Sequence, residues 1–472
     1  MQTRARTRIV GVDTARGLAV LGMFVAHLGM ERHSEIWTTT GWFSLGDGRP
    51  SALFAMLAGI GLVFMTRRAQ DDPARFAFQR GRILRRALIL YLLGYGLVFL
   101  GTPVAVILPA YAVLFVVAVP FLRMSAVAVL GCAGIVLAIG PQVLVLTRHA
   151  FHGEAGPVHE LALLPGLAEV WSGYYPAITW LAYILVGVAV GKADLRSPRV
   201  ATALLGIGSV VAALGYGAGA FAEGALVGRE GTIAFDLITI EPHANSTPEM
   251  LGNAGFAVAL LGLCLLAMSL APLRVIAAPL NAVGAMSLTI YSLHIVYIAI
   301  LGTDAVWYPV SNWPLIWLVL ASLAFAIIWQ KTLGQGPLER LLARLMGSRR
   351  PPASGPGPTP PGSHHQVSPQ YPAPGQHHVP PPPGSAQYQP PQRPRASTTP
   401  PPAPGPHYQP PQAAPVQHPP NQQPYYPASP DPQTPATHQV PVQHQGPPPY
   451  PPAAPAPPYP PAAPAPPPQP RA

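Results

Sequence analysis

Long apolar segments with few charges between them restrict the fold of this chain more than any other feature. Residues 1–350 are dominated by stretches rich in Leu, Ala, Val, Gly and Ile, and a helix needs about 20 such residues to cross a membrane. Backbone groups inside a bilayer must be satisfied within the segment, which favours helices. We therefore predict an all-α fold, a polytopic membrane helix bundle of about ten spans. The expected spans are residues 9–30, 51–66, 86–102, 104–122, 125–146, 173–191, 199–222, 252–271, 279–301 and 312–331.

The remaining segment, residues 351–472, has a different composition. All but 17 of the 64 prolines lie in it, among scattered Tyr, Gln and His residues. Too few aliphatic side chains are present to form a hydrophobic core. We expect a disordered Pro-rich cytoplasmic tail with polyproline II character, a conformation that partner domains can recognise.

The basic residues fit membrane topology better than nucleic-acid binding. The formal net charge is +10, but Arg and Lys occur in short clusters beside apolar segments. Most clusters fall on one side of the expected spans, including residues 67–86, read here as a cytoplasmic loop. We therefore expect a multi-pass plasma-membrane protein, in contact with membrane lipid, with both termini in the cytoplasm. No nucleic-acid partner and no metal site are predicted.

Ionisable residues inside or next to expected spans mark candidate functional positions. His27 falls in the outer half of the first span, and His294 reaches a similar depth in residues 279–301. A neutral His can accept a proton from a hydroxyl or amine, and a carboxylate can orient it. The catalytic candidates are therefore His33, His27, His294 and Asp47. Packing roles for the individual histidines remain an open alternative.

Further polar residues are expected near the same outer face. The long loop over residues 223–251 could cap a substrate pocket, since it is rich in polar side chains. The substrate-binding candidates are Arg49, His243, Asn245 and Tyr291. Asp13 and Arg16, three residues apart near the inner surface, are interpreted mainly as a structural pair.

Two local patterns leave their role open. The glycine pairs Gly59/Gly61 and Gly94/Gly96 permit either close helix packing or room for a narrow cofactor arm. Residues 333–350 alternate apolar and basic positions at helical spacing, which predicts either a helix on the inner leaflet or the solvated end of the last span.

Four stretches of the chain carry a family resemblance: RIVGVDTARGLAVLGMFVAH, DGRPSALFAMLAGIGL, RRALILYLLGYGLVFLGTPVAVILPAYAVLFVVAVPFL and PLNAVGAMSLTIYSLHI. Together they resemble the heparan-α-glucosaminide N-acetyltransferase-like transmembrane acyltransferases and their bacterial polytopic relatives of unknown substrate. The resemblance covers most of residues 8–300. It implies that acetyl-CoA binds from the cytoplasmic side and that an acetyl group passes to an acceptor on the other side.

The resemblance also implies residue roles. A histidine in the loop after the first span would handle the acetyl group, which His33 matches best, with Asp47 as its partner and His27 lining the same pocket. The phosphates of acetyl-CoA suit guanidinium groups, and the cofactor-binding candidates are Arg16, Arg82, Arg85 and Arg86. Positive-inside topology alone would also account for these arginines.

The favoured interpretation is a membrane acyltransferase that moves an acetyl or similar acyl group from cytoplasmic acyl-CoA to an amine or hydroxyl of an envelope glycan or glycolipid. Two alternatives stay open. One is a transporter or lipid carrier with a His-lined pathway, and the other is a membrane scaffold that acts through the Pro-rich tail. The sequence carries no Walker loop or nucleophile elbow, which argues against an ATP-driven pump.

Overall fold

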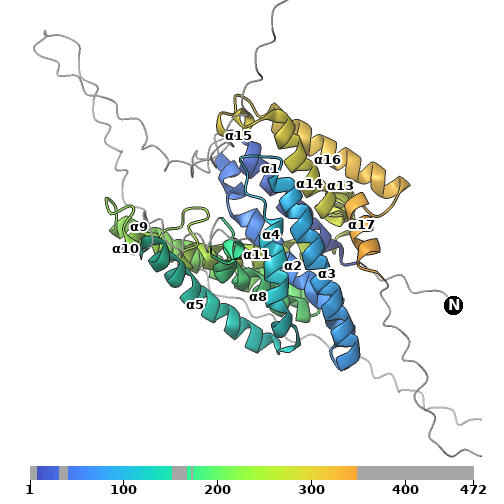
Figure 1. The fold of residues 1–472 in the computed structure, drawn as a ribbon, viewed down its shortest axis with the longest axis horizontal. Coiled ribbons are helices and arrows are strands. Elements are labelled where there is room, and N and C mark those ends of the chain that lie inside the picture. The colour runs from blue at the N-terminus through green and yellow to red at the C-terminus, as the bar shows by residue number, and fades with distance from the viewer. Residues whose placement is uncertain (1–7, 31–40, 151–166, 172–173, 348–472) are drawn as a thin grey trace, which may run out of the picture. The chain divides into compact units, whose positions relative to one another are not determined.

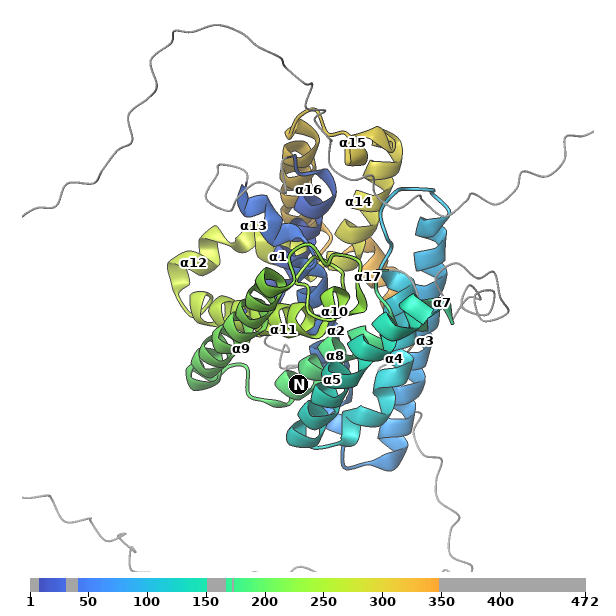
Figure 2. The ribbon, with the colours of Figure 1, turned by 90° about the vertical axis from the view of Figure 1, so that its left-hand side faces the viewer.

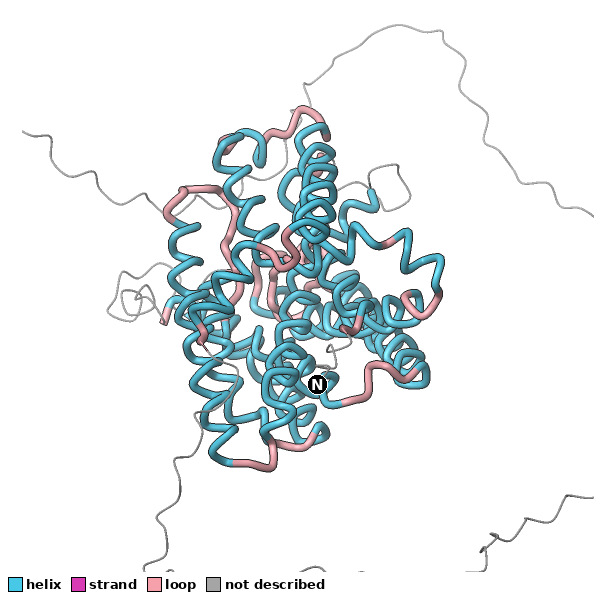
Figure 3. The backbone as a smooth tube through the Cα atoms, turned by 90° about the vertical axis from the view of Figure 1, so that its right-hand side faces the viewer, coloured by secondary structure: helices cyan, strands magenta, loops and turns pink. Residues whose placement is uncertain are grey.

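The computed structural model describes residues 8–30, 41–150, 167–171 and 174–347, and every regular element in these ranges is a helix (Figures 1 and 3). The all-α prediction is confirmed for this part of the chain. The Pro-rich tail predicted over residues 351–472 lies outside the described residues.

The longer helices are α1 (Val10–Leu28), α2 (Arg49–Thr66), α3 (Pro73–Val98), α4 (Leu108–Ala118), α5 (Ala126–Ala150), α8 (Ala177–Lys192), α9 (Pro198–Ala225), α11 (Thr247–Ala267), α13 (Ala278–Ala285), α14 (Ser287–Leu301), α16 (Trp313–Thr332) and α17 (Pro337–Leu345). The short helices are η1 (Gly41–Gly46), η2 (Arg67–Ala69), η3 (Val119–Arg123), α7 (Ala168–Trp171), α10 (Ile233–Asp236), α12 (Ala271–Ile276) and α15 (Asp304–Trp307). Helices α1 and α2 are central, since α1 contacts α2, α11, α13 and α16, and α2 also packs on α8 (Figure 1).

The expected count of ten spans is not confirmed. Each predicted interval contains a helix, but within the described residues only five helices are long and apolar enough to cross a membrane. These are Gly41–Ala69, Ala126–Ala150, Pro198–Ala225, Thr247–Ala267 and Trp313–Thr332. The number is six if α13 and α14 form one bent span. The chain is thus a membrane protein, while the side on which its termini lie remains a prediction.

The predicted loop over residues 67–86 is wrong, because most of it is helical. Helix α3 begins at Pro73, and the carboxylate of Asp72 accepts a hydrogen bond from the backbone N–H of Arg75 at 3.0 Å. Asp before a helix and Pro at its first position are both start signals. The local sequence therefore specified this helix, although its cluster of arginines suggested a cytoplasmic loop.

Helices α1 and α13 cross at backbone contact. A Cβ on Gly284 would overlap the carbonyl oxygen of Asp13, and a Cβ on Gly17 would overlap the carbonyl oxygen of Leu280. Small residues allow such approaches between membrane helices. Beyond this crossing the chain turns by 86° at Met286. The segment predicted as a span over residues 279–301 is therefore broken into two helices, α13 and α14.

Each glycine pair consists of one closely packed position and one open position. Gly59 packs against the backbone of α8, and Gly94 packs against the proline near the start of α4. A Cβ on Gly61 or Gly96 would meet nothing within 4 Å. Close packing thus explains the first glycine of each pair, whereas Gly61 lines a cavity.

Helices α9 and α11 lie side by side (Figure 2) and also meet through glycines. A Cβ on Gly208 of α9 would overlap the backbone nitrogen of Ala259 in α11, whereas one on Gly206 would meet nothing within 4 Å.

We expect Gly208→Ala to lower the free energy of unfolding by about 1–3 kcal/mol, because the added methyl group forces the two backbones apart. The matched variant Gly206→Ala should be neutral or stabilising by up to about 1 kcal/mol, from helix propensity. Melting temperatures of the two purified variants in one detergent would compare them. Equal melting temperatures would show that the α9–α11 contact is looser than described.

Candidate functional site

The structure brings two predicted catalytic residues together. His27 near the end of α1 and His294 in the middle of α14 are hydrogen-bonded, with 3.1 Å between Nδ1 of His27 and Nε2 of His294. Their rings are nearly parallel, with centroids 5.3 Å apart. His294 is completely buried, whereas His27 is partly exposed. The two histidines that the sequence assigned to a similar depth are thus in direct contact.

The hydrogen bonds of His294 fix which nitrogen carries each proton. Its Nδ1 lies 2.6 Å from the backbone carbonyl oxygen of Tyr291, and a carbonyl can only accept. Nδ1 of His294 is therefore the protonated nitrogen, and Nε2 accepts from Nδ1–H of His27. In a neutral His27 the unprotonated nitrogen is then Nε2, which has the lone pair a general base needs.

Aromatic rings surround the histidine pair. The ring of Phe24 lies 5.0 Å from that of His294, and so does the ring of Tyr291. The hydroxyl of Tyr291 accepts a hydrogen bond from the backbone N–H of Ile107 at 3.1 Å. Tyr291, predicted to bind substrate, thus supports the histidine pair and lies beside it.

A cavity of about 280 Å³ lies among α1, α2, α3, α4, α13, α14 and α17. Two of the predicted cofactor-binding residues, Arg16 and Arg86, line it together with Glu339. Phe54 forms part of the apolar wall, and its ring stacks with that of Tyr291 at 6.5 Å. Because Tyr291 also contacts His294, one aromatic layer separates this cavity wall from the histidine pair.

The other two predicted cofactor-binding arginines do not line this cavity. Arg82 is buried and donates to the side chain of Gln79 at 3.0 Å. Arg85 is exposed on the surface of α3. Arg82 lies about one helical turn before Arg86 on the same side of α3 but does not reach the cavity, whereas Arg85 lies on a different side of the helix.

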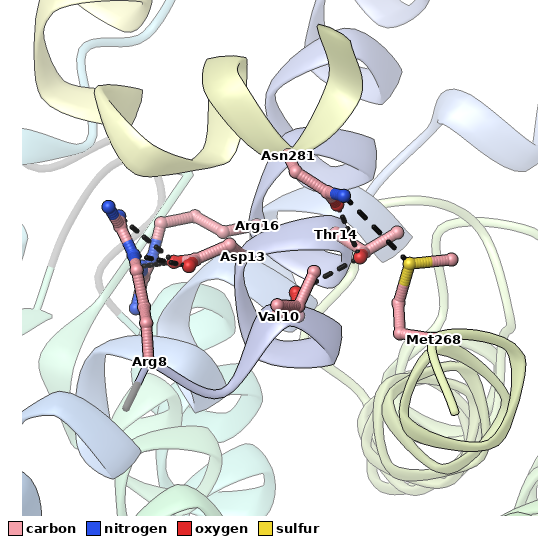
Figure 4. Close-up of polar contacts among 7 residues, drawn as sticks. All are labelled: Arg8, Val10, Asp13, Thr14, Arg16, Met268 and Asn281. Carbon is pink, nitrogen blue, oxygen red and sulfur yellow. Dashed lines mark hydrogen bonds and ion pairs between the residues drawn. The ribbon is translucent and has the colours of Figure 1, made fainter. Parts of the chain in front are cut away.

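The predicted structural pair of Asp13 and Arg16 is present, and a third residue joins it (Figure 4). Nη1 of Arg16 lies 3.2 Å from the Asp13 carboxylate, which also pairs with Arg8. On the other side of α1, the hydroxyl of Thr14 donates to the side-chain oxygen of Asn281 at 2.6 Å. The bond between Thr14 and Asn281 connects α1 to α13 at the glycine crossing.

A second polar cluster lies at the start of α11. The hydroxyl of Ser246 accepts a hydrogen bond from the backbone N–H of Glu249 at 3.2 Å and caps the helix. The buried Glu249 carboxylate accepts bonds from the backbone N–H groups of His243 at 3.1 Å and Asn245 at 2.8 Å. It also accepts a bond from the side chain of Asn253 at 2.8 Å. Sequence analysis missed Glu249 and Asn253 as parts of a site.

Three predicted substrate-binding residues belong to this second cluster. We call it the outer cluster, because the sequence predicts its residues near the outer face. The side-chain oxygen of Asn245 accepts a hydrogen bond from the indole N–H of Trp180 at 2.8 Å. The guanidinium of Arg49 lies over the ring of Tyr216, 4.9 Å from its centroid. The hydroxyl of Tyr216 donates to Asn253 at 2.6 Å. Arg49 is thereby connected to the same network as His243 and Asn245.

His243 has an unusual environment. Its imidazole lies against the rings of Tyr174, Tyr175 and Trp180, at centroid distances of 5.4, 5.6 and 6.3 Å. Nδ1 is buried and has no hydrogen-bond partner within the described residues. The backbone of His243 is left-handed, with φ of 65°, a conformation that costs energy in residues other than glycine.

Two further catalytic candidates from the sequence are His33 and Asp47. His33 lies outside the described residues. Asp47 is partly buried in the turn between η1 and α2, where its backbone N–H donates to the carbonyl of Ser44 at 3.1 Å. His149, at the end of α5, is not a site candidate from the sequence, and its Nε2 lies 2.8 Å from the carboxylate of Asp236.

Comparison with known proteins divides the chain into two overlapping parts. Residues 8–216 match the family described as heparan-alpha-glucosaminide N-acetyltransferase, catalytic. Residues 194–348 match a family described as protein of unknown function (DUF418). No curated protein and no solved structure matches the chain. His27 belongs to the first matched region and His294 to the second, so the histidine pair needs both.

Burial makes the outer cluster sensitive to acid. It lowers the pKa of His243 to about 4, whereas an unfolded histidine titrates near 6.5. Between these values the unfolded chain binds a proton that the native chain does not. The free energy of unfolding should therefore fall as the pH drops from about 6.5 to 4, by at most about 3 kcal/mol from this residue.

We expect His243→Asn, which tolerates the left-handed backbone, to reduce this loss of stability. Melting temperatures of the wild type and the variant in detergent at several pH values between 7.5 and 4 would measure it. Parallel curves for the two proteins would contradict the assignment.

Proposed function

Because the chain belongs to the heparan-α-glucosaminide N-acetyltransferase-like family of membrane proteins, we propose that it is an acyl-CoA-dependent acyltransferase. It moves an acetyl or similar acyl group from cytoplasmic acyl-CoA to an amine or hydroxyl of a sugar-containing envelope molecule. The observation that supports this best is the hydrogen bond between His27 and His294. The donor supplies an acyl group already activated as a thioester.

The cavity beside Arg16 and Arg86 has the properties that such a donor needs. Two guanidinium groups suit an anionic group, and the buried Nε of Arg86 has no hydrogen-bond partner within the described residues. The apolar wall at Phe54 and the open side at Gly61 suit an uncharged arm. The arm would point toward Tyr291, beyond which the histidines lie.

The histidine pair would supply the base. Nε2 of His27 accepts the proton of the acceptor hydroxyl or amine, so that the acceptor atom can attack the acyl carbon. The bond to the acceptor forms, the carbon–sulfur bond breaks, and the proton passes from His27 to the departing sulfur. His294 holds Nδ1–H of His27 and stabilises the charged imidazole, while its own Nδ1–H is fixed by Tyr291.

Acetyl handling by His33, with Asp47 as partner, stays a prediction of the family resemblance. Asp47 precedes α2 directly and α1 ends at Leu28, so the segment between them begins next to His27. A transient acyl carrier in that segment would be compatible with His27 as the base.

The outer cluster is the proposed acceptor side. The aromatic rings around His243 offer flat surfaces for a sugar, and Arg49 and Asn245 offer polar groups near them. The cluster lies at the start of α11, close to Gly48 at the beginning of α2. A glycan or glycolipid would approach it from the predicted noncytoplasmic side.

Transfer of radiolabel from acetyl-CoA to envelope extract by the purified protein would test the proposal. We expect His27→Gln to reduce the rate by about 10²–10⁴-fold, since general-base catalysis contributes that much. His294→Gln should reduce it less, because it removes orientation and leaves the base. His149→Gln, a histidine outside the pair, is the matched control and should keep wild-type activity.

A transporter is the second candidate, because a broken helix beside buried polar groups is also a transporter feature. Uptake of a solute into vesicles that depends on a pH gradient, with no consumption of acetyl-CoA, would favour it. Transfer unaffected by both histidine variants would count against the acyltransferase mechanism.

A further inference from the structure

The beginning of α14 is already occupied by a carboxylate. One oxygen of Glu339 accepts hydrogen bonds from the backbone N–H groups of Leu288 at 2.8 Å and Thr289 at 3.1 Å. The other oxygen accepts a bond from the Thr289 hydroxyl at 2.6 Å. The first N–H groups of a helix have no partner within the helix and carry partial positive charge, so they attract anions. Glu339 therefore fills an anion-binding position.

The same carboxylate faces the cavity described above. Glu339 lines it together with Arg16 and Arg86, and so do Ser287 and Leu288 from the beginning of α14. Arg86 has no ion pair among the described residues, its guanidinium lies 5.7 Å from the ring centroid of Phe115, and its buried Nε lacks a partner there. The cavity thus combines two cations and a helix beginning with one resident anion.

Glu339 belongs to α17, a short helix that a turn joins to α16. A left-handed glycine, Gly334, lies between α16 and α17 with φ of 79°. Helix α17 is strongly amphipathic in sequence, yet only Leu342 and Met346 bury their side chains, while Leu341 and Leu345 stay about half exposed. The predicted inner-leaflet helix is therefore a separate helix, held on the protein by these apolar side chains, by the Glu339 carboxylate and by a hydrogen bond of 3.1 Å from the backbone N–H of Leu338 to the Thr289 hydroxyl.

We propose that Glu339 is an internal competitor for the anionic group of the acyl donor, and that α17 is the gate that carries it. This inference rests on the proposed function. When the phosphate-type anion of acyl-CoA enters, it takes the helix beginning and the two arginines, and Glu339 withdraws with α17. Without donor, the carboxylate balances charge in the cavity and keeps its inner end closed.

The geometry gives a reason for a competitor. Two guanidinium groups beside a helix beginning would bind any small anion, including phosphate or a lipid headgroup. A tethered carboxylate is always present at high effective concentration. Only a ligand that also gains contacts with the apolar wall would displace it, so Glu339 raises selectivity for a donor with both an anionic group and an arm.

The test uses the full chain in nanodiscs of neutral lipid and direct binding of CoA. We expect Glu339→Gln to bind CoA about tenfold more tightly, because the glutamine oxygen still accepts hydrogen bonds but no longer repels the anion. Pantetheine, which lacks phosphate, should bind equally to both proteins. Arg86→Gln should bind CoA more weakly, and Glu241→Gln, an exposed carboxylate before α11, is the matched control and should not change binding.

The outcomes separate the two proposals. If neither the wild type nor Glu339→Gln binds CoA, the acyltransferase proposal fails. If the wild type binds CoA and Glu339→Gln binds it equally or more weakly with a lower melting temperature, Glu339 is only a helix cap and the gate is refuted. Tighter binding of pyrophosphate without tighter binding of CoA would also refute it. The gate would also be refuted if the difference in CoA affinity between the wild type and Glu339→Gln disappeared when anionic lipid was added to the nanodisc. The group bound at the cavity would then be a lipid headgroup.

Discussion

The backbone contact between α1 and α13 is the constraint on which the rest of the site depends. With no side chain at Gly17 or Gly284, the two helices cross closely, and the bond between Thr14 and Asn281 fixes their register. Arg16 is held at the cavity on this crossing. His27 lies 11 residues further along α1, a rise of about 16 Å. The crossing thus sets the distance between the charged end of the site and its histidines.

Because of the bend at Met286, the short helix α14 contributes both to the cavity and to the histidine pair. An unbroken helix would have satisfied its own N–H groups, and none would have been available to an anion. After the bend, α14 begins at the cavity with its N–H groups bound to Glu339 and carries His294 about two turns later. Unsatisfied polar groups are costly in a membrane. The two polar features of α14 are therefore stable because each has a partner on another helix, Glu339 on α17 and His27 on α1.

The sequence predicted the fold class and the residues that meet, but not the contacts that arise from packing. His27 and His294 could be paired because span direction and depth follow from apolar length. The bend could not, because no proline marks Met286 and the break depends on how α13 meets α1. Glu339 resembles a solvated residue on an amphipathic helix. Glu249 follows Ser246 at the spacing of a capping box, yet its carboxylate binds the N–H groups of His243 and Asn245 instead.

Helix α2 extends from the outer cluster to the cavity. Its start carries Arg49 at the outer cluster, and Gly61, 12 residues later and about 18 Å along the helix, lines the cavity. Between them lies Ser51. Its backbone carbonyl accepts a hydrogen bond from Tyr111 at 3.3 Å, and the Ser51 side chain interacts with Tyr175. Tyr111 belongs to the cavity wall, whereas Tyr175 lies against His243. A solute carrier must move its whole cargo past these buried rings, but an acyltransferase needs only an acyl group to pass. The arrangement of Tyr111 and Tyr175 between the cavity and the outer cluster is thus better suited to group transfer than to transport.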